Sequence, residues 1–99
     1  MSAGKKGARN QSLMWEVRCA PGSTTAMEEW VRDTIVPGLW DDEQVASYCV
    51  YSSAGSEGDR VVVVIDYLGA APAADLPAAP PEGLAARPAH SWVFQRLDI

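Results

Sequence analysis

The chain has 99 residues, a formal net charge of −5 and a hydrophobic fraction of 47%, enough for one domain with one modest core. All 13 acidic residues lie after residue 12, and such an acidic body argues against a nucleic-acid partner. No run of about 18 apolar residues predicts a membrane span, and no apolar segment of a secretory signal follows the basic N-terminus. We therefore expect a cytoplasmic protein without a membrane partner.

The first twelve residues, MSAGKKGARNQS, carry Lys5, Lys6 and Arg9 and no acid. Such a segment is typical of a solvated, disordered leader, although it could also touch an acidic surface. We therefore expect a basic tail at 1–12 and a single domain at 13–99.

The segment 13–21 alternates between apolar and mixed side chains, which predicts a strand with one buried face. Pro21 and Gly22 end it. One face holds Leu13, Trp15, Val17 and Cys19, and the other holds Met14, Glu16 and Arg18.

The segment 23–40 has apolar residues at helical spacing, which predicts an amphipathic helix. Thr25 and Glu28 have the spacing of a capping box. Pro37 and Gly38 are expected to kink or stop the helix.

Two further strands are expected at 45–53 and 59–69, joined by a hairpin loop at 54–59 that contains Gly55 and Gly58. The second of them contains five consecutive β-branched residues at 61–65. A strand with one solvent-exposed face would alternate apolar and polar residues. This run therefore predicts a central strand that is covered on both faces.

The stretch 69–90 is rich in proline and alanine, which leaves room for one helical turn at most, beginning at Pro81 and running through Leu84 to Arg87. It is a semi-rigid surface connection or, alternatively, a lid over a pocket. The last strand is expected at 90–99, with one face made of His90, Trp92, Phe94 and Arg96.

This order of elements, β-α-β-β-(short α)-β, predicts an α+β fold of the ferredoxin-like type with a four-stranded antiparallel sheet. Right-handed connections place the first and third strands in the centre, the fourth strand outside the first, and the second outside the third. The helix covers one sheet face. The other would be a large apolar patch, so we expect a second copy of the chain to cover it in a homodimer.

The two cysteines, Cys19 and Cys49, have no metal-ligand spacing and are interpreted as small buried apolar side chains. The predicted sheet places a strand between them, which separates their Cα atoms by about 9–10 Å. A disulfide needs less than about 7 Å, so we expect them not to pair.

The segments MWEVRCAPG, TTAMEEWVRDTIVPGLW, VYSSAGSEGDRVVVVIDYLG and HSWVFQRLD together resemble the dimeric α+β barrel superfamily. Within it, the chain is similar to the antibiotic-biosynthesis-monooxygenase-like group. The resemblance covers about residues 13–99 and implies a dimeric α+β barrel whose pockets lie between sheet and helices. The group includes cofactor-free oxygenases of phenolic substrates, and the proline-rich stretch stands where such chains usually have a second helix.

The sequence contains one histidine and lacks a nucleophile elbow, a phosphate-binding loop and a metal-ligand cluster, so we predict no metal and no cofactor. Haem bound through His90 is a third, minor alternative. A planar aromatic substrate is expected to stack among tryptophans near His90, as general base, and Tyr67, as hydrogen-bond donor. The predicted substrate-binding residues are Trp92, Trp30, Arg96, Arg18 and Trp40.

Two functions follow from these patterns. The resemblance implies a cofactor-independent monooxygenase-like enzyme that acts on an aromatic or polyketide-like compound. The alternative is a non-catalytic dimeric module that binds a ligand or a protein, because one fold hosts many functions.

Overall fold

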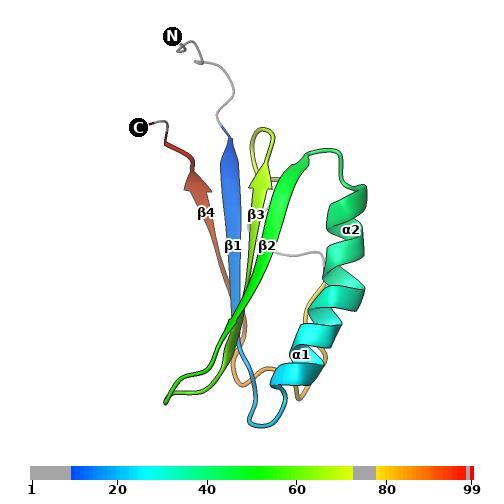
Figure 1. Cartoon of the computed structure of the whole chain (residues 1–99), viewed down its shortest axis with the longest axis vertical. Helices are drawn as coiled ribbons and strands as arrows, with labels where there is room; N and C mark the ends of the chain where they lie inside the picture. Colours follow the sequence, from blue (N-terminus) through cyan, green and yellow to red (C-terminus); the bar gives the residue numbers. More distant parts are fainter. Residues whose placement is uncertain (1–9, 73–77, 98) are drawn as a thin grey trace.

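The structure, a computed structural model, describes residues 10–72, 78–97 and 99. Four strands and one helical segment follow one another in the expected order (Figure 1). They are β1 (Gln11–Arg18), α1 (Thr24–Trp30), η2 (Val31–Ile35), α2 (Val36–Asp41), β2 (Val45–Ser53), β3 (Arg60–Tyr67) and β4 (His90–Gln95). Strand β1 begins two residues before the expected domain boundary, and most of the predicted tail lies outside the described residues.

The four strands form one antiparallel sheet in the order β2-β3-β1-β4. This confirms the ferredoxin-like prediction, including the central place of the valine-rich strand β3. Directly paired residues of an antiparallel sheet share a face, so the register assigns every side chain to a face. Val63 lies opposite Trp15, and Val64 lies opposite Met14.

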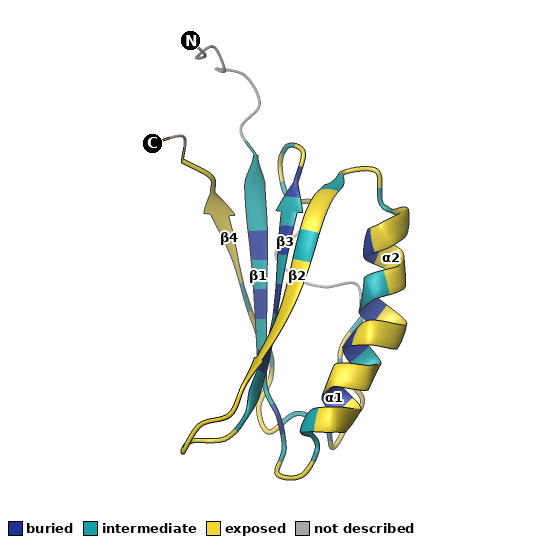
Figure 2. Cartoon of the chain, in the orientation of Figure 1, coloured by how far each residue is buried: buried dark blue, intermediate teal, exposed yellow. Residues whose placement is uncertain are grey.

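The core lies between one sheet face and the helical segment (Figure 2). Strand β3 alternates strictly between buried and half-buried residues although its sequence does not alternate. From here on, this covered side is called the helix face and the opposite side the bare face. The buried core residues are Leu13, Trp15, Val17, Cys19, Met27, Val31, Ile35, Leu39, Val61, Val63, Ile65 and Tyr67.

The helical segment is continuous from Thr24 to Asp41, although Pro37 and Gly38 were expected to kink or stop it. Its middle, Val31–Ile35, is π-helical, and the Val36 N–H donates to the carbonyl of Val31, five residues back. A proline removes one N–H and crowds the carbonyl four residues earlier. The wider π turn just before Pro37 relieves that crowding, so the chain keeps its direction.

The helix begins without the capping box that the sequence predicts. Ser23 occupies the N-cap position, and no side chain caps the first turn. The Thr24 hydroxyl instead donates to the Asp59 carboxylate at 2.6 Å. The first helical turn is therefore tied to the segment that leads into β3.

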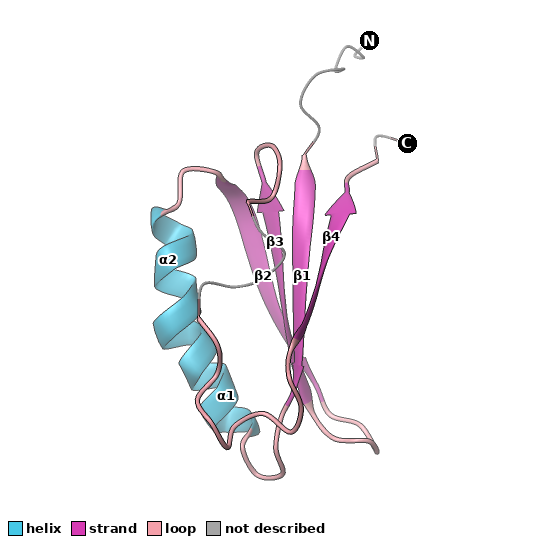
Figure 3. Cartoon of the chain, turned by 180° about the vertical axis from the view of Figure 1, so that it is seen from behind, coloured by secondary structure: helices cyan, strands magenta, loops and turns pink. Residues whose placement is uncertain are grey.

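The proline- and alanine-rich connection forms a turn where a short helix was expected. Its described part, 78–89, contains a turn at 82–84 and a bridge between Cys19 and Ala85. The Ala20 N–H donates to the carbonyl of Leu84, and the Ala86 N–H donates to that of Arg18. The connection thus pairs with the end of β1 and runs on the helix side of the sheet (Figure 3).

The bare face has no cover within the described chain. The row of directly paired residues through its middle is Cys49, Val64, Met14 and Trp92, apolar on every strand. Tyr51 and Phe94 lie beside this row and are 57% and 48% exposed. Both cysteines are free, as predicted, but Cys49 is exposed on this face while Cys19 lies in the core.

The same substitution on the two sides of the sheet should separate their roles. Met27→Ala empties a fully buried site and should lower the free energy of unfolding by about 2–5 kcal/mol at any protein concentration. Met14→Ala on the bare face should cost clearly less in a dilute sample. Urea unfolding at low concentration measures both, and equal losses would contradict the assignment of the core to the helix face.

Candidate functional site

A cleft of about 800 Å³ lies between the helical segment and β2. Among the described residues, its walls come from the helical segment and the first six residues of β2. The lining residues are Glu28, Val31, Arg32, Val36, Leu39, Trp40, Val45, Ala46, Ser47, Tyr48, Cys49 and Val50.

The cleft reaches the unpaired edge of β2. Successive residues of a strand point to opposite faces, yet Tyr48, Cys49 and Val50 all line the cleft. The pairing of β2 with β3 shifts register between Val45 and Ser47, which makes Ala46 the extra residue of a bulge. Bulges bend a strand and redirect its side chains, and this one lies inside the cleft wall.

Two aromatic rings form the clearest recognition feature of the cleft. Trp40 of α2 and Tyr48 of β2 make an edge-to-face pair with ring centroids 6.4 Å apart. Trp40 is 75% exposed, so most of its ring surface faces outward. Such a ring offers apolar area for a planar molecule at a low cost in side-chain entropy.

Charged groups are confined to Glu28 and Arg32 among the residues that line the cleft. The Arg32 guanidinium is bound to the neighbouring Asp33 carboxylate at 2.8 Å, and this contact lowers the pKa of Asp33. Both side chains are exposed, so water screens the pair and it adds little to stability. Arg32 is therefore a partly neutralised cation at the cleft.

The structure divides the residues that the sequence predicts for one site between the two faces of the sheet. Tyr67, Trp30 and Trp40 lie on the helix side, where Tyr67 is buried and Trp30 packs against the core. His90, Trp92 and Arg18 lie on the bare face, and Arg96 follows the end of β4. Of these seven residues, only Trp40 lines the cleft.

His90 and Trp92 form a second aromatic pair on the bare face. Their rings are stacked, with centroids 6.1 Å apart and planes inclined by 25°. His90 lies opposite Glu16 in the sheet. The sheet separates this pair from Tyr67, so His90 and Tyr67 cannot act on the same atom within one chain.

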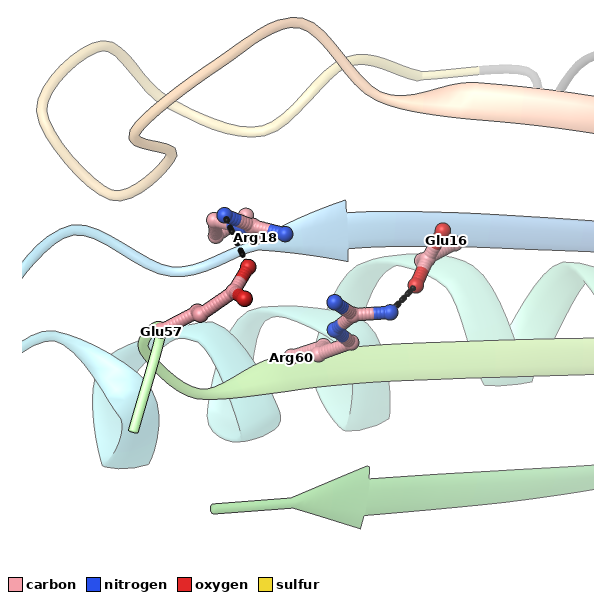
Figure 4. Close-up of polar contacts among 4 residues, drawn as sticks. All are labelled: Glu16, Arg18, Glu57 and Arg60. Carbon is pink, nitrogen blue, oxygen red and sulfur yellow. Dashed lines mark hydrogen bonds and ion pairs between the residues drawn. The ribbon is translucent and has the colours of Figure 1, made fainter. Parts of the chain in front are cut away.

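Two ion pairs join β1 to β3 and its preceding loop at one end of the bare face (Figure 4). The Arg60 guanidinium donates to the Glu16 carboxylate at 2.6 Å, and Arg18 lies 3.9 Å from Glu57. At the other end, the Asp66 carboxylate accepts hydrogen bonds from the hydroxyls of Ser12 and Ser47. The charges of this face are thus paired or hydrogen-bonded around an apolar middle.

Sequence reasoning missed most of the cleft. Tyr48, Val36 and Val45 line it, and each belongs to an apolar pattern that equally predicts core packing. Nothing in the spacing of these residues showed that a cleft would open between β2 and the helical segment. One signal for the cleft was available in the apolar pair Leu39-Trp40 after Pro37. Trp40 lies outside the row of apolar helix residues that pack in the core.

No group of three or more metal-ligating side chains occurs among the described residues. In the same part of the chain, no helix is long and apolar enough to cross a membrane.

Comparison with known proteins supports the fold alone. The solved structure of Rv0793 from Mycobacterium tuberculosis superposes with a TM-score of 0.65 and 18% sequence identity, covering 91% of this chain and 97% of that chain. No family model matches the sequence. A search of curated proteins also found no match. The fold is therefore shared with a known protein, and function has to be inferred from this chain's own residues.

The buried phenol of Tyr67 should make stability depend on pH in the alkaline range. Burial, with a smaller contribution from the Asp42 carboxylate, raises the pKa of Tyr67 above its ordinary value of 10.0. The unfolded chain then releases this proton first, so the free energy of unfolding should fall as pH rises above about 10. Urea unfolding from pH 8 upward should show a smaller fall for Tyr67→Phe. An unchanged pH dependence in the variant would contradict this origin.

Proposed function

We propose that this protein is a homodimeric domain that binds a small apolar, aromatic molecule in the cleft between the helical segment and β2. The observation that carries the proposal is the cleft itself. Its volume of about 800 Å³ falls in the range of roughly 300–1,000 Å³ that is usual for small-molecule sites. Its lining is mainly apolar with a few polar groups, which is the usual composition of such sites.

The ring pair of Trp40 and Tyr48 supports an aromatic ligand in particular. An edge-to-face pair presents a ring face to a third ring, and aromatic contacts add about 0.5–1.5 kcal/mol beyond area burial. Arg32 lines the same cleft and favours a ligand with a weak negative charge. Among the described lining residues only Glu28 and Arg32 are charged, and Asp33 partly neutralises Arg32, which argues against a strongly charged ligand.

The bare face supports the homodimer. Four strands of about eight residues give a flat sheet area of about 500 Å². The side chains that project from the sheet make its accessible surface area larger than this flat area. A standard interface buries about 800 Å² per partner, so this face is of the right order. Its apolar middle with paired charges at the margins also has the usual arrangement of an interface, an apolar core inside a polar rim.

The geometry favours a binding module over the monooxygenase-like enzyme that the sequence resemblance implies. Cofactor-free oxygenation of a phenol needs a base within hydrogen-bond reach of the substrate. The cleft's described lining offers Glu28 as its only carboxylate and no histidine, while His90 lies on β4, at the opposite edge of the sheet. The resemblance in fold to Rv0793 carries no chemistry by itself.

Ligand binding should depend on the exposed ring of Trp40. With anilinonaphthalene sulfonate as an aromatic probe, we expect fluorescence enhancement on binding to the dimer. Trp40→Ala should weaken binding by about tenfold or more, because it removes the main ring surface, and Trp40→Phe should keep most of it. Fluorescence titration measures the affinities.

The matched control is Trp92→Ala, which removes the same side chain from the bare face. At a concentration where this variant is still a dimer, its affinity for the probe should equal that of the wild type. Equal losses in the two alanine variants would mean that the probe binds elsewhere, and the cleft would lose its assignment.

The dimer should form through the bare face. Light scattering behind a sizing column should give a mass near twice 10.6 kDa. Val64→Asp introduces a charge in the middle of the apolar row and should yield monomers, because an unpaired charge is costly to bury. Ser52→Asp, on the helix face of the neighbouring strand, should remain a dimer.

Thiol reactivity gives an independent readout of the same interface. Cys49 is exposed in the single chain and should react slowly in the dimer but quickly in the Val64→Asp monomer. Burial raises the pKa of the Cys19 thiol, so Cys19 should stay unreactive in both. A wild-type monomer with a reactive Cys49 would refute the dimer.

A further inference from the structure

The rings of Trp40 and Tyr48 form a nearly right-angled corner in the wall of the cleft. Their planes are inclined by 78° and their centroids lie 6.4 Å apart, so a group placed in the angle between them contacts the faces of both rings. Both side chains line the cleft, and Trp40 is largely exposed. The face of an aromatic ring is the negative pole of its quadrupole. The corner therefore attracts a cation as well as apolar surface.

The corner lies at the C-terminal end of the helical segment. Helix α2 ends at Asp41, one residue after Trp40, and its last turn contains no basic residue. The last carbonyl groups of a helix together carry about half a negative elementary charge, which a nearby cation stabilises. The backbone thus favours positive charge at the same place as the two rings.

Three carboxylates follow Trp40 directly along the chain. They belong to Asp41, Asp42 and Glu43. The Asp42 carboxylate accepts a hydrogen bond from the backbone N–H of Gln44 at 2.8 Å, whereas Asp41 and Glu43 are exposed. Among the described residues, none of the three forms an ion pair. Their charge is not offset there, and it adds to the negative potential around the corner.

The cation that lines the cleft is distant from this corner. Arg32 lies eight residues before Trp40, which is about 12 Å along a helix. Its guanidinium is bound to the Asp33 carboxylate at 2.8 Å, and Glu28 lines the cleft one helical turn further on. That end of the cleft suits a neutral polar or weakly acidic group. The positive charge of a ligand is favoured at the Trp40 end.

The composition of the lining selects one class of cation. A metal ion needs several oxygen, nitrogen or sulfur ligands, and the described residues contain no group of three that could hold one. An ammonium ion substituted with methyl or alkyl groups needs no such ligands. It binds the faces of aromatic rings, and its apolar groups are stabilised by burial against the apolar lining of the cleft.

We infer that the ligand of the cleft is an organic ammonium ion. Its quaternary or tertiary nitrogen lies in the corner between Trp40 and Tyr48, and its apolar remainder lies along the helical segment toward Arg32. This inference rests on the proposed ligand site and adds the sign and the position of the charge that the site accepts.

A pair of probes with the same shape isolates the effect of the charge. Choline and 3,3-dimethylbutan-1-ol differ in the exchange of a quaternary nitrogen for a carbon atom. In a titration followed by the indole N–H signals in NMR spectra, choline should shift the Trp40 signal and bind about fivefold or more tightly than the alcohol. The signal that is missing from the spectrum of Trp40→Leu identifies Trp40.

Replacing the ring by an aliphatic side chain separates the cation–π contact from apolar contact. Trp40→Leu should remove the preference for choline over the alcohol, because leucine keeps apolar surface but has no aromatic face. Trp40→Phe should keep part of the preference. Trp92→Leu, the same change on the bare face, is the matched control and should leave both affinities as in the wild type.

Neutralising the nearby carboxylates tests their contribution. The double variant Asp41→Asn and Glu43→Gln should lower the affinity for choline about two- to threefold and leave that for the alcohol unchanged. The difference should shrink as the salt concentration rises, because both carboxylates are exposed and salt screens them. Asp42 is kept, because its carboxylate holds the loop through Gln44.

The possible failures are distinguishable. Equal affinities for choline and the alcohol, or a preference for choline that persists in Trp40→Leu, would overturn the inference. Binding of anilinonaphthalene sulfonate that depends on Trp40, without binding of choline, would also overturn it and leave the proposed aromatic site intact. If neither choline, the alcohol nor anilinonaphthalene sulfonate shifts the Trp40 signal, the proposed function on which the inference rests is refuted.

Discussion

The structure depends on one constraint: a four-stranded sheet has two faces, and the described residues of this chain cover only one of them. The helical segment and the proline- and alanine-rich connection both lie on the same side, where Trp15, Val63 and Met27 are fully shielded from water. Apolar surface left in water costs roughly 25 cal/mol per Å² relative to burial. The bare face, with Val64, Met14 and Trp92 in one row, therefore leaves an unfavourable apolar surface exposed to water in the single chain.

The incomplete covering of the sheet by one helical segment also determines where the candidate ligand site lies. One helical segment does not cover the full width of four strands, and it leaves gaps beside β2 at one edge of the sheet and over β4 at the other. The first gap is the cleft lined by Trp40 and Tyr48, and the second is the exposed Val93. The cleft and the bare face thus both follow from the presence of a single helical segment among the described residues, which is why the proposed dimer and the proposed binding site are linked.

Polar contacts fix the geometry without providing the main stabilisation. The Thr24–Asp59 hydrogen bond ties the start of the helix to β3, and the Glu16–Arg60 pair holds β1 against β3. Partly exposed ion pairs contribute at most about 1 kcal/mol each. Their value lies in orientation, because they keep charges paired at the margins of the bare face and leave its middle apolar. The Asp66 carboxylate, bound by two serine hydroxyls, does the same at the other end.

The sequence by itself determined the strands, their order in the sheet and the central place of the Val61–Ile65 run, because periodicity and β-branching act locally and right-handed connections leave few topologies. It also predicted that the cysteines do not pair. Only the tertiary structure decided that the helix passes through Pro37, that His90 and Tyr67 lie on opposite faces, and that a cleft opens beside β2. These depend on the register between paired strands, a π turn and the packing of the helical segment beside β2, none of which is encoded in the spacing of residues along the chain.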